Sequence, residues 1–222
     1  MRFGIIGAGT VGTTIGSKLV RLGHEVVIGS RPSGGGRAAA WVAEADDGAG
    51  EGTPAEAAAF GEVVVNCTPG AASLEALAAA GEENLAGKLL IDVANPLDFS
   101  AGSEPTLTVA NDDSLGERIQ RAFPATRVVK AFNTMNSEVM VDPSLVDGDH
   151  VIFVCGEDAE AKARVSDLLG EIGWPAERVL DLGGISAARA TEALILLWLR
   201  LAAIAGSYRF NFAIAPPAPD RG

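Results

Sequence analysis

Short apolar runs alternate with segments of helical pattern from the first residue to about residue 182. Such alternation predicts an α/β fold whose mostly parallel sheet is covered by helices on both faces, a doubly wound arrangement. The runs richest in Val, Ile and Leu are the predicted strands: Arg2–Ile6, Glu25–Ile28, Val63–Cys67, Leu89–Val93, Arg127–Ala131, Val151–Cys155 and Arg178–Asp181.

Helix starts and loops are marked between these strands. Thr53–Glu56 joins a capping Thr and Glu with proline at the first helical position, and Ser114–Glu117 repeats the capping box without the proline. The glycine-rich stretches Ser33–Gly36 and Asp46–Gly52 predict surface loops. Ala215–Gly222 predicts an extended, proline-rich tail.

The pattern changes at Gly183-Gly184, so we expect a main domain over residues 1–182 and a small C-terminal helical appendage over 183–222. Ala187–Ala205 predicts a long helix that is apolar nearly all round. Such a helix would not lie alone in water. We expect it to pack into a cleft or against a second subunit.

The composition narrows the classes of partner. With 222 residues, 48% of them apolar, and a net charge of −12, the chain can bury a full core but would repel nucleic acid. Cys67 and Cys155 have no metal-like spacing, which predicts buried free thiols in a reducing, cytoplasmic compartment and no bound metal. The longest apolar stretch, Ala193–Ala205, is too short to span a membrane.

A glycine-rich turn follows the first strand. Gly7-Ala8-Gly9-Thr10-Val11-Gly12 comes after Phe3–Ile6 and opens a helix expected over Val11–Leu22. Gly7 suits the tight turn, Gly9 a close approach of the backbone to pyrophosphate, and Gly12 close packing of helix on strand. The helix N-terminus would offer free N–H groups to the phosphates. The context of strand, turn and helix predicts a Rossmann-type dinucleotide site.

The end of the second strand distinguishes the two nicotinamide cofactors. NAD-binding domains carry a carboxylate there for the ribose 2′-hydroxyl, whereas this chain has Ser30-Arg31. Ser30 can donate to a phosphate oxygen and Arg31 can pair with the 2′-phosphate of NADP. Arg37 is a second candidate phosphate ligand, with a plain surface position as the alternative. The sequence therefore favours NADP(H).

Ligands of open parallel sheets bind beyond the carboxyl ends of the strands. Thr68-Pro69 can line the ribose side of the cofactor, and Ala94-Asn95-Pro96 can lie beside the nicotinamide. A third strand ends in Phe132-Asn133-Thr134. Each of these stretches could instead be an ordinary polar end to a strand.

Together with Gly29-Ser30-Arg31, Asn95-Pro96 and Val129–Thr134, the Gly7–Gly12 turn makes residues 1–214 resemble the NADPH-dependent coenzyme F420 reductases. The chain is also similar to the reductase domain of the STEAP metalloreductases. The resemblance implies a homodimer and a small C-terminal domain that completes a cleft. It also implies a small-molecule redox acceptor, and hydride transfer between NADP(H) and F420 or a related flavin-like compound.

Carried onto this chain, the resemblance also implies the site. The expected cofactor-binding residues are Gly7, Gly9, Thr10, Val11, Gly12, Ser30, Arg31, Arg37, Thr68, Pro69, Ala94 and Asn95. The expected acceptor pocket contains Pro96, Asn133, Met135 and Trp198. Asn133 stands where deazaflavin reductases tend to place histidine, which leaves the acceptor open. We assign no catalytic proton donor, because hydride transfer between stacked rings depends chiefly on positioning. His24 and His150 are expected to be structural.

Other functions fit parts of the pattern. Hydroxyacid dehydrogenases and pyrroline-carboxylate reductases share the N-terminal pattern but add a large helical domain, for which 183–222 is short. Reduction of a small carbonyl or imine compound is an alternative enzymatic function. A non-catalytic NADPH sensor is the alternative outside the enzymes, and a second ring-sized pocket beside the nicotinamide would count against it.

Overall fold

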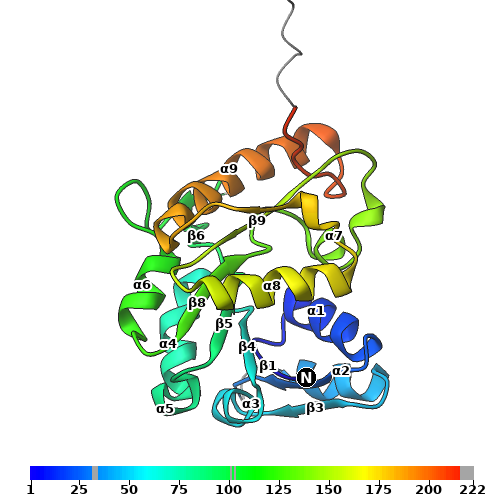
Figure 1. Ribbon diagram of the computed structural model, residues 1–222, viewed down its shortest axis with the longest axis vertical. Helices are drawn as coiled ribbons and strands as arrows, with labels where there is room; N and C mark the ends of the chain where they lie inside the picture. The colour runs from blue at the N-terminus through cyan, green and yellow to red at the C-terminus, as the bar shows by residue number, and fades with distance from the viewer. Residues whose placement is uncertain (32–34, 101, 103, 216–222) are drawn as a thin grey trace, which may run out of the picture.

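A computed structural model describes residues 1–31, 35–100, 102 and 104–215. Helices and strands alternate along the chain and form one layered α/β unit (Figure 1). Positions 33 and 34 of the predicted loop Ser33–Gly36, and 216–222 of the predicted tail, lie outside the described residues.

The described chain forms an eight-stranded sheet in the order β10-β9-β8-β5-β4-β1-β2-β3, and a separate hairpin β6–β7. The strands are β1 (Arg2–Ile6), β2 (Glu25–Gly29), β3 (Ala49–Gly52), β4 (Val63–Asn66), β5 (Leu89–Asp92), β6 (Leu97–Asp98), β7 (Thr106–Leu107), β8 (Arg127–Ala131), β9 (Ile152–Cys155) and β10 (Val179–Asp181). From β3 to β8 all neighbours are parallel, in the strand order of dinucleotide-binding domains. β9 runs antiparallel to β8 and parallel to β10. The predicted doubly wound, mostly parallel sheet is confirmed.

Three strands were not predicted. The stretch Asp46–Gly52, expected to be a surface loop, contains the edge strand β3, which pairs with β2 from Val26↔Ala49 to Gly29↔Gly52. Its sequence Ala-Gly-Glu-Gly has no β-branched or aromatic residue, so only pairing with β2 makes it a strand. The hairpin of β6 and β7 has two residues in each strand, too few to show an alternating pattern.

Helices are present at the four positions that the sequence predicted: after the glycine turn, after Thr53, after Ser114 and over nearly all of Ala187–Ala205. The described helices are α1 (Thr10–Arg21), α2 (Arg37–Glu44), α3 (Pro54–Phe60), α4 (Gly70–Ala80), α5 (Glu82–Leu85), α6 (Leu115–Ala122), α7 (Ser137–Val141), α8 (Ala159–Ile172) and α9 (Ala188–Ala205), with 3-10 turns at Pro143–Leu145, Ala176–Arg178 and Ile185–Ala187. The capping box that begins α3 is confirmed, because Thr53 and Glu56 bond to each other's backbone N–H. At α6 the prediction is half right: Ser114 accepts from the N–H of Glu117, but the Glu117 carboxylate pairs with Arg189 instead of the Ser114 N–H.

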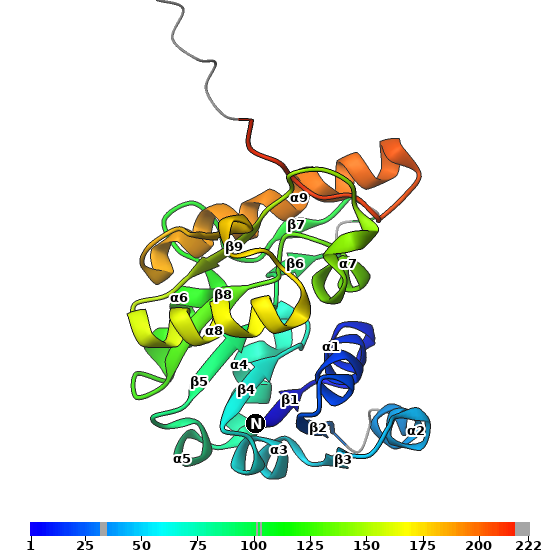
Figure 2. The same cartoon turned by 45° about the vertical axis from the view of Figure 1, so that its right-hand side comes forward.

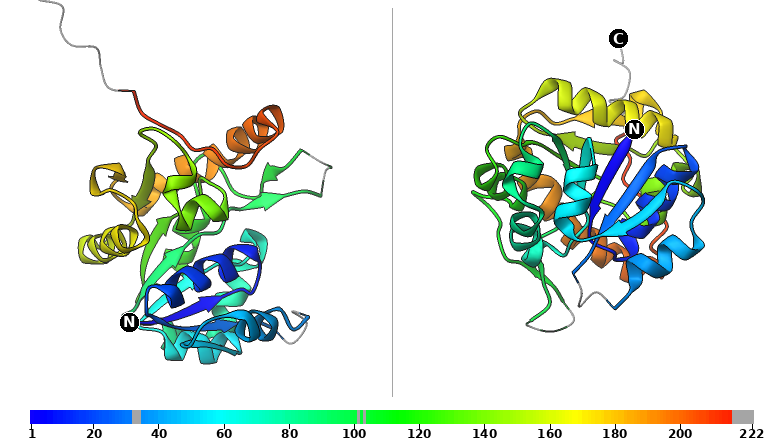
Figure 3. Two further views of the ribbon diagram at one scale, coloured as in Figure 1. Left: turned by 90° about the vertical axis from the view of Figure 1, so that its right-hand side faces the viewer. Right: turned by 90° about the horizontal axis from the view of Figure 1, so that it is seen from below.

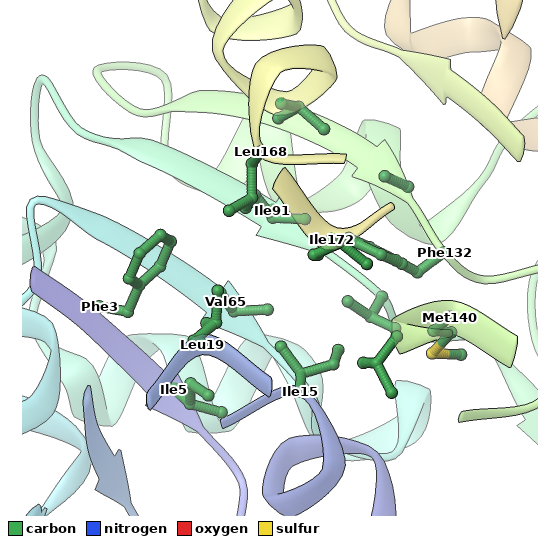
Figure 4. Close-up of a cluster of buried hydrophobic side chains, with 14 of the residues drawn as sticks. Phe3, Ile5, Ile15, Leu19, Val65, Ile91, Phe132, Met140, Leu168 and Ile172 are labelled. Atoms are coloured by element: carbon green, nitrogen blue, oxygen red, sulfur yellow. The ribbon is translucent and has the colours of Figure 1, made fainter. Parts of the chain in front are cut away.

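Alternate side chains of the strands pack on opposite faces of the sheet. Val63 and Val65 of β4 join the apolar cluster beneath α1, α2 and α8, whereas Val64 joins the cluster beneath α3 to α6. Figure 4 shows the first cluster, in which Ile15 of α1 and Leu168 of α8 lie over the same face of the strands. This explains why the strands read as unbroken apolar runs, and the two helical layers are visible from below in Figure 3.

The C-terminal helix α9 lies across one end of the molecule, beside the hairpin β6–β7 (Figure 2). Its residues Ile195, Trp198 and Ala202 form a third apolar cluster, against which Leu97 and Leu107 of the hairpin pack. On its outer side Leu197 is 51% and Ile204 is 76% exposed. None of the helices in the described part of the chain, α9 included, is long and apolar enough to cross a membrane.

Candidate functional site

The glycine turn lies between β1 and α1 at the carboxyl end of the sheet. Gly7 has φ +113°, and a Cβ there would lie 2.8 Å from the carbonyl oxygen of Cys67. A Cβ on Gly12 would lie 2.0 Å from the carbonyl oxygen of Gly7. Both positions therefore require glycine for the fold itself. A Cβ on Gly9, in contrast, would meet nothing within 4 Å, so this residue faces open space.

That space is part of a cleft of about 710 Å³ that runs along the carboxyl ends of the central strands. It is lined by these residues of the predicted site: Gly7, Gly9, Thr10, Val11, Ser30, Arg31, Arg37, Thr68, Pro69, Ala94, Asn95, Asn133 and Met135. They come from the ends of five parallel strands, β1, β2, β4, β5 and β8, and from the starts of α1 and α2. A cleft beyond the strand ends is where open α/β sheets bind ligands.

The positive end of the cleft lies at Ser30, Arg31 and Arg37. The structure adds Glu75 of α4, which sequence reasoning missed because α4 carried no recognisable motif. Arg31 Nη1 lies 3.9 Å from Glu75 Oε1, and their side chains are 64% and 78% exposed. An exposed pair at this distance contributes little to stability. The Arg31 guanidinium is therefore available to an anion in the cleft.

Two asparagines join the loops after β5 and β8. Asn95 Nδ2 donates to the Asn133 carbonyl at 2.7 Å, and Asn133 Nδ2 donates to Asn95 Oδ1 at 3.0 Å. Phe132, just before Asn133, is buried and has φ +67°, a conformation that is strained for a bulky residue. The paired asparagines hold this part of the cleft wall in one arrangement.

A buried hydrogen-bond chain orients Thr68. Its hydroxyl donates to Asn66 Oδ1 at 2.6 Å, and Asn66 Nδ2 donates to Asp92 Oδ1 at 2.8 Å. Asp92 Oδ1 also accepts from the N–H of Ala94 at 3.2 Å. Asn66 and Asp92 end adjacent parallel strands, so the register Asn66↔Asp92 brings them side by side. Their side chains shape the cleft from beneath without lining it.

Beyond Asn95 the cleft becomes apolar, with Leu97, Phe99, Met135 and Met140 in its lining. Phe99 is 57% exposed, which is unusual for a large aromatic side chain beside a cleft. Of these four, only Met135 was named from the sequence, because the hairpin that carries Leu97 and Phe99 has no clear pattern. This end suits a flat, uncharged ring.

Three predicted site residues lie outside the described lining: Gly12, Pro96 and Trp198. Gly12 is buried against Gly7. Trp198 stacks on Phe210 at 5.4 Å and on Tyr208 at 5.7 Å between ring centroids. Leu97, which lines the cleft, packs against the apolar cluster that contains Trp198.

Neither histidine lines the cleft over the described residues. His24 packs against Phe3 with the two rings tilted and contacts Glu171, while His150 packs on Trp174 and bonds to the Pro143 carbonyl. Burial raises the pKa of the Cys67 thiol, and the nearby Asp92 carboxylate raises it further. Cys67 therefore stays protonated and is unsuited to act as a nucleophile.

With this geometry in view, comparison with known proteins identifies the family. Residues 2–96 match the family model described as NADP oxidoreductase, coenzyme F420-dependent. The F420-dependent NADP reductase of Methanothermobacter marburgensis is 32% identical over 204 residues, which cover 88% of this chain and 89% of that protein. The chain belongs to the coenzyme F420-dependent NADP oxidoreductase family. The predicted family is confirmed.

Two further proteins are similar to this chain over most of its length. A crystal structure from Arthrobacter sp. FB24, described as a candidate F420-dependent NADP reductase, is 49% identical with a TM-score of 0.92, covering 97% of this chain and all of that one. Metalloreductase STEAP3 of the rat is 30% identical over 200 residues, which are 88% of this chain. This chain spans 36% of the length of that metalloreductase.

Proposed function

We propose that this chain is an NADP(H)-dependent oxidoreductase that transfers hydride between NADPH and a deazaflavin such as coenzyme F420, or a related flavin-like acceptor. The observation that carries the proposal is a single cleft that has arginines at one end, a glycine turn in the middle and apolar side chains at the other. These three parts of the cleft, in this order, are complementary to a 2′-phosphate, a pyrophosphate and a pair of stacked rings. Family membership supports the same assignment.

The chain's own residues would bind and orient the cofactor. The first N–H groups of α1, next to Gly9, would donate to the pyrophosphate, whose approach the open space at Gly9 permits. Ser30 and Arg31 would bind the 2′-phosphate, with Arg37 as a further ligand. Thr68, Pro69, Ala94 and Asn95 would surround the ribose and nicotinamide.

When bound, NADPH would supply a hydride and leave as NADP⁺, and the acceptor ring would gain that hydride together with one proton taken up from bulk solvent. The protein's contribution is then to hold two rings in contact and to exclude water. Met135 and Asn133 would line the acceptor site, together with Leu97 and Phe99. Trp198 would support this wall indirectly through Leu97.

The experiment is a titration with NADPH followed by stopped-flow mixing with coenzyme F420. We expect tight NADPH binding and oxidation of one NADPH for each F420 reduced. Tight binding without F420 or flavin reduction would contradict the proposal and favour the sensor. Reduction of a carbonyl or imine panel, with F420 left unchanged, would favour the small-substrate reductase.

We also propose that 183–222 is an appendage whose helix α9 joins two copies in a homodimer within a cytoplasmic, reducing environment. The support is the exposure of Leu197, Ile204 and Tyr208 on and just after α9. The unpaired thiols of Cys67 and Cys155 fit a reducing compartment.

A further inference from the structure

Three charged side chains are buried together beneath the cleft. Lys130 Nζ of β8 lies 2.8 Å from Asp92 Oδ2 and 2.8 Å from Glu192 Oε1 of α9. Lys130 and Asp92 have no exposed side-chain surface, and Glu192 has 2%. Burial favours the neutral amine, but the two carboxylates raise the pKa of Lys130, so it stays charged. We name Lys130, Asp92 and Glu192 the buried charge cluster.

Every donor of the Lys130 ammonium is used. Beyond the two carboxylates it donates to the carbonyl oxygen of Ala94, which completes the three hydrogen bonds that an ammonium can make. Asp92 Oδ1 accepts from the N–H of the same residue, Ala94. The cluster therefore holds both backbone polar groups of Ala94, a residue that lines the cleft.

Glu192 connects this arrangement to two helices. It extends from α9, and its carboxylate accepts from the N–H groups of Leu115 at 2.8 Å and Gly116 at 3.0 Å at the start of α6. A helix N-terminus stabilises a carboxylate. Glu192 thus has a fixed position, and its Oε1 fixes the Lys130 ammonium in turn.

Stability alone does not account for these charges. Burying three ions has a desolvation cost that their attraction only partly offsets, and well-packed apolar residues would hold the same fold as well or better. Apolar residues, however, could not hydrogen-bond to both the N–H and the C=O group of Ala94. The burial of these three charges is accounted for if the function of the cleft requires the Ala94 backbone to have a fixed position.

We propose that Lys130 and Glu192 are positioning residues for hydride transfer, which fix the Ala94 backbone against the nicotinamide ring without touching the ring. The inference rests on the proposed function, because it takes the Ala94 end of the cleft as the nicotinamide site. The adenosine end, at Ser30 and Arg31, would not depend on the cluster.

The test is Glu192→Gln, which keeps the size of the side chain and one carbonyl oxygen but weakens its hold on Lys130. Glu117→Gln is the matched control, because Glu117 also joins α6 to α9, through Arg189 at 2.6 and 2.8 Å. Glu117 makes no described contact with Lys130. Both variants should remain folded, as melting curves would establish.

We expect Glu192→Gln to slow single-turnover hydride transfer from NADPH to F420 about tenfold, because small errors in ring placement are costly. Its Kd for NADPH should change by less than about twofold. The contacts that bind NADPH equally in the ground state and the transition state are separate from those that position the ring. The fluorescence of the bound nicotinamide should change in Glu192→Gln and not in Glu117→Gln.

Equal rates and equal nicotinamide fluorescence in the two variants would overturn the inference while leaving the proposed function intact. A parallel loss of NADPH affinity, rate and melting temperature in Glu192→Gln would also overturn it, by assigning the cluster to stability. If the unaltered chain failed to bind NADPH, the proposed function itself would be contradicted.

Discussion

At the scale of single residues, Arg31 carries the choice between NADP and NAD. Arg31→Ala should reduce the preference for NADPH over NADH by about 1.5–3 kcal/mol, the value of a charged hydrogen bond. Titration of the unaltered chain and of Arg31→Ala with NADPH and with NADH would measure this change in preference. Arg121→Ala is the control, because Arg121 of α6 is similarly exposed and pairs with Asp113, which lies just before that helix. Equal affinity of the unaltered chain for both cofactors would refute the assignment.

Two glycines of the same turn should respond differently to a methyl group. Gly9→Ala should weaken NADPH binding while keeping the fold, because its Cβ would occupy open cleft space. Gly12→Ala should instead lower the melting temperature, since its Cβ would overlap the Gly7 carbonyl oxygen at 2.0 Å. Circular dichroism melting and NADPH titration separate the two effects. Unchanged affinity in Gly9→Ala would mean that the turn does not bind phosphate.

At the scale of elements, the contact between α6 and α9 should weaken in acid. The hydrogen-bonded Arg189 guanidinium lowers the pKa of Glu117, so the ionised form is favoured in the folded state. A carboxyl group of this kind stabilises the fold fully above the unfolded pKa of about 4.3, and the stabilisation is lost as pH falls through the lower folded value.

Glu117→Gln should therefore lower the free energy of unfolding by about 1–2 kcal/mol at neutral pH. The difference from the unaltered chain should shrink as the pH falls below about 4, because protonation then removes the same charge. Melting curves across this pH range would check it. A difference that grows in acid would contradict the sign of the argument.

Elements with a repeating pattern were predicted well, and elements without one were not. β1 and β8 were predicted with their observed bounds because each lies between two other strands of the sheet and consists mostly of buried apolar residues. β3 was missed, since an Ala-Gly-Glu-Gly edge strand exists only by pairing with β2. The capping box at Ser114 was half right because Arg189, distant in sequence, attracts the Glu117 carboxylate.

At the scale of the whole molecule, the outer side of α9 should form the dimer contact. Leu197→Glu should convert a dimer into a monomer in sedimentation velocity, because Leu197 is 51% exposed and a charge there would be buried by a partner. Leu74→Glu on α4, a leucine that is 38% exposed, is the control. A monomeric unaltered chain would refute the homodimer.

The sequence by itself determined the features that depend on neighbours along the chain. The glycine turn, the capping of α3, the central strands and the absence of a carboxylate after β2 could all be identified within short segments, since local backbone geometry requires those residue types. From these followed the fold class, the family and about half of the cleft-lining residues.

Only the tertiary structure decided which distant side chains meet. Lys130 and Asp92 are 38 positions apart, and Glu192 lies on a helix that reads as apolar. Nothing local requires their contact, because it arises from the sheet order and from the packing of α9 over α6. The same holds for Arg31 with Glu75, and for Leu97 and Phe99 at the acceptor end. The residue pattern within a short segment indicates the backbone conformation of that segment. The pairing of buried charges depends instead on how the helices pack on the sheet.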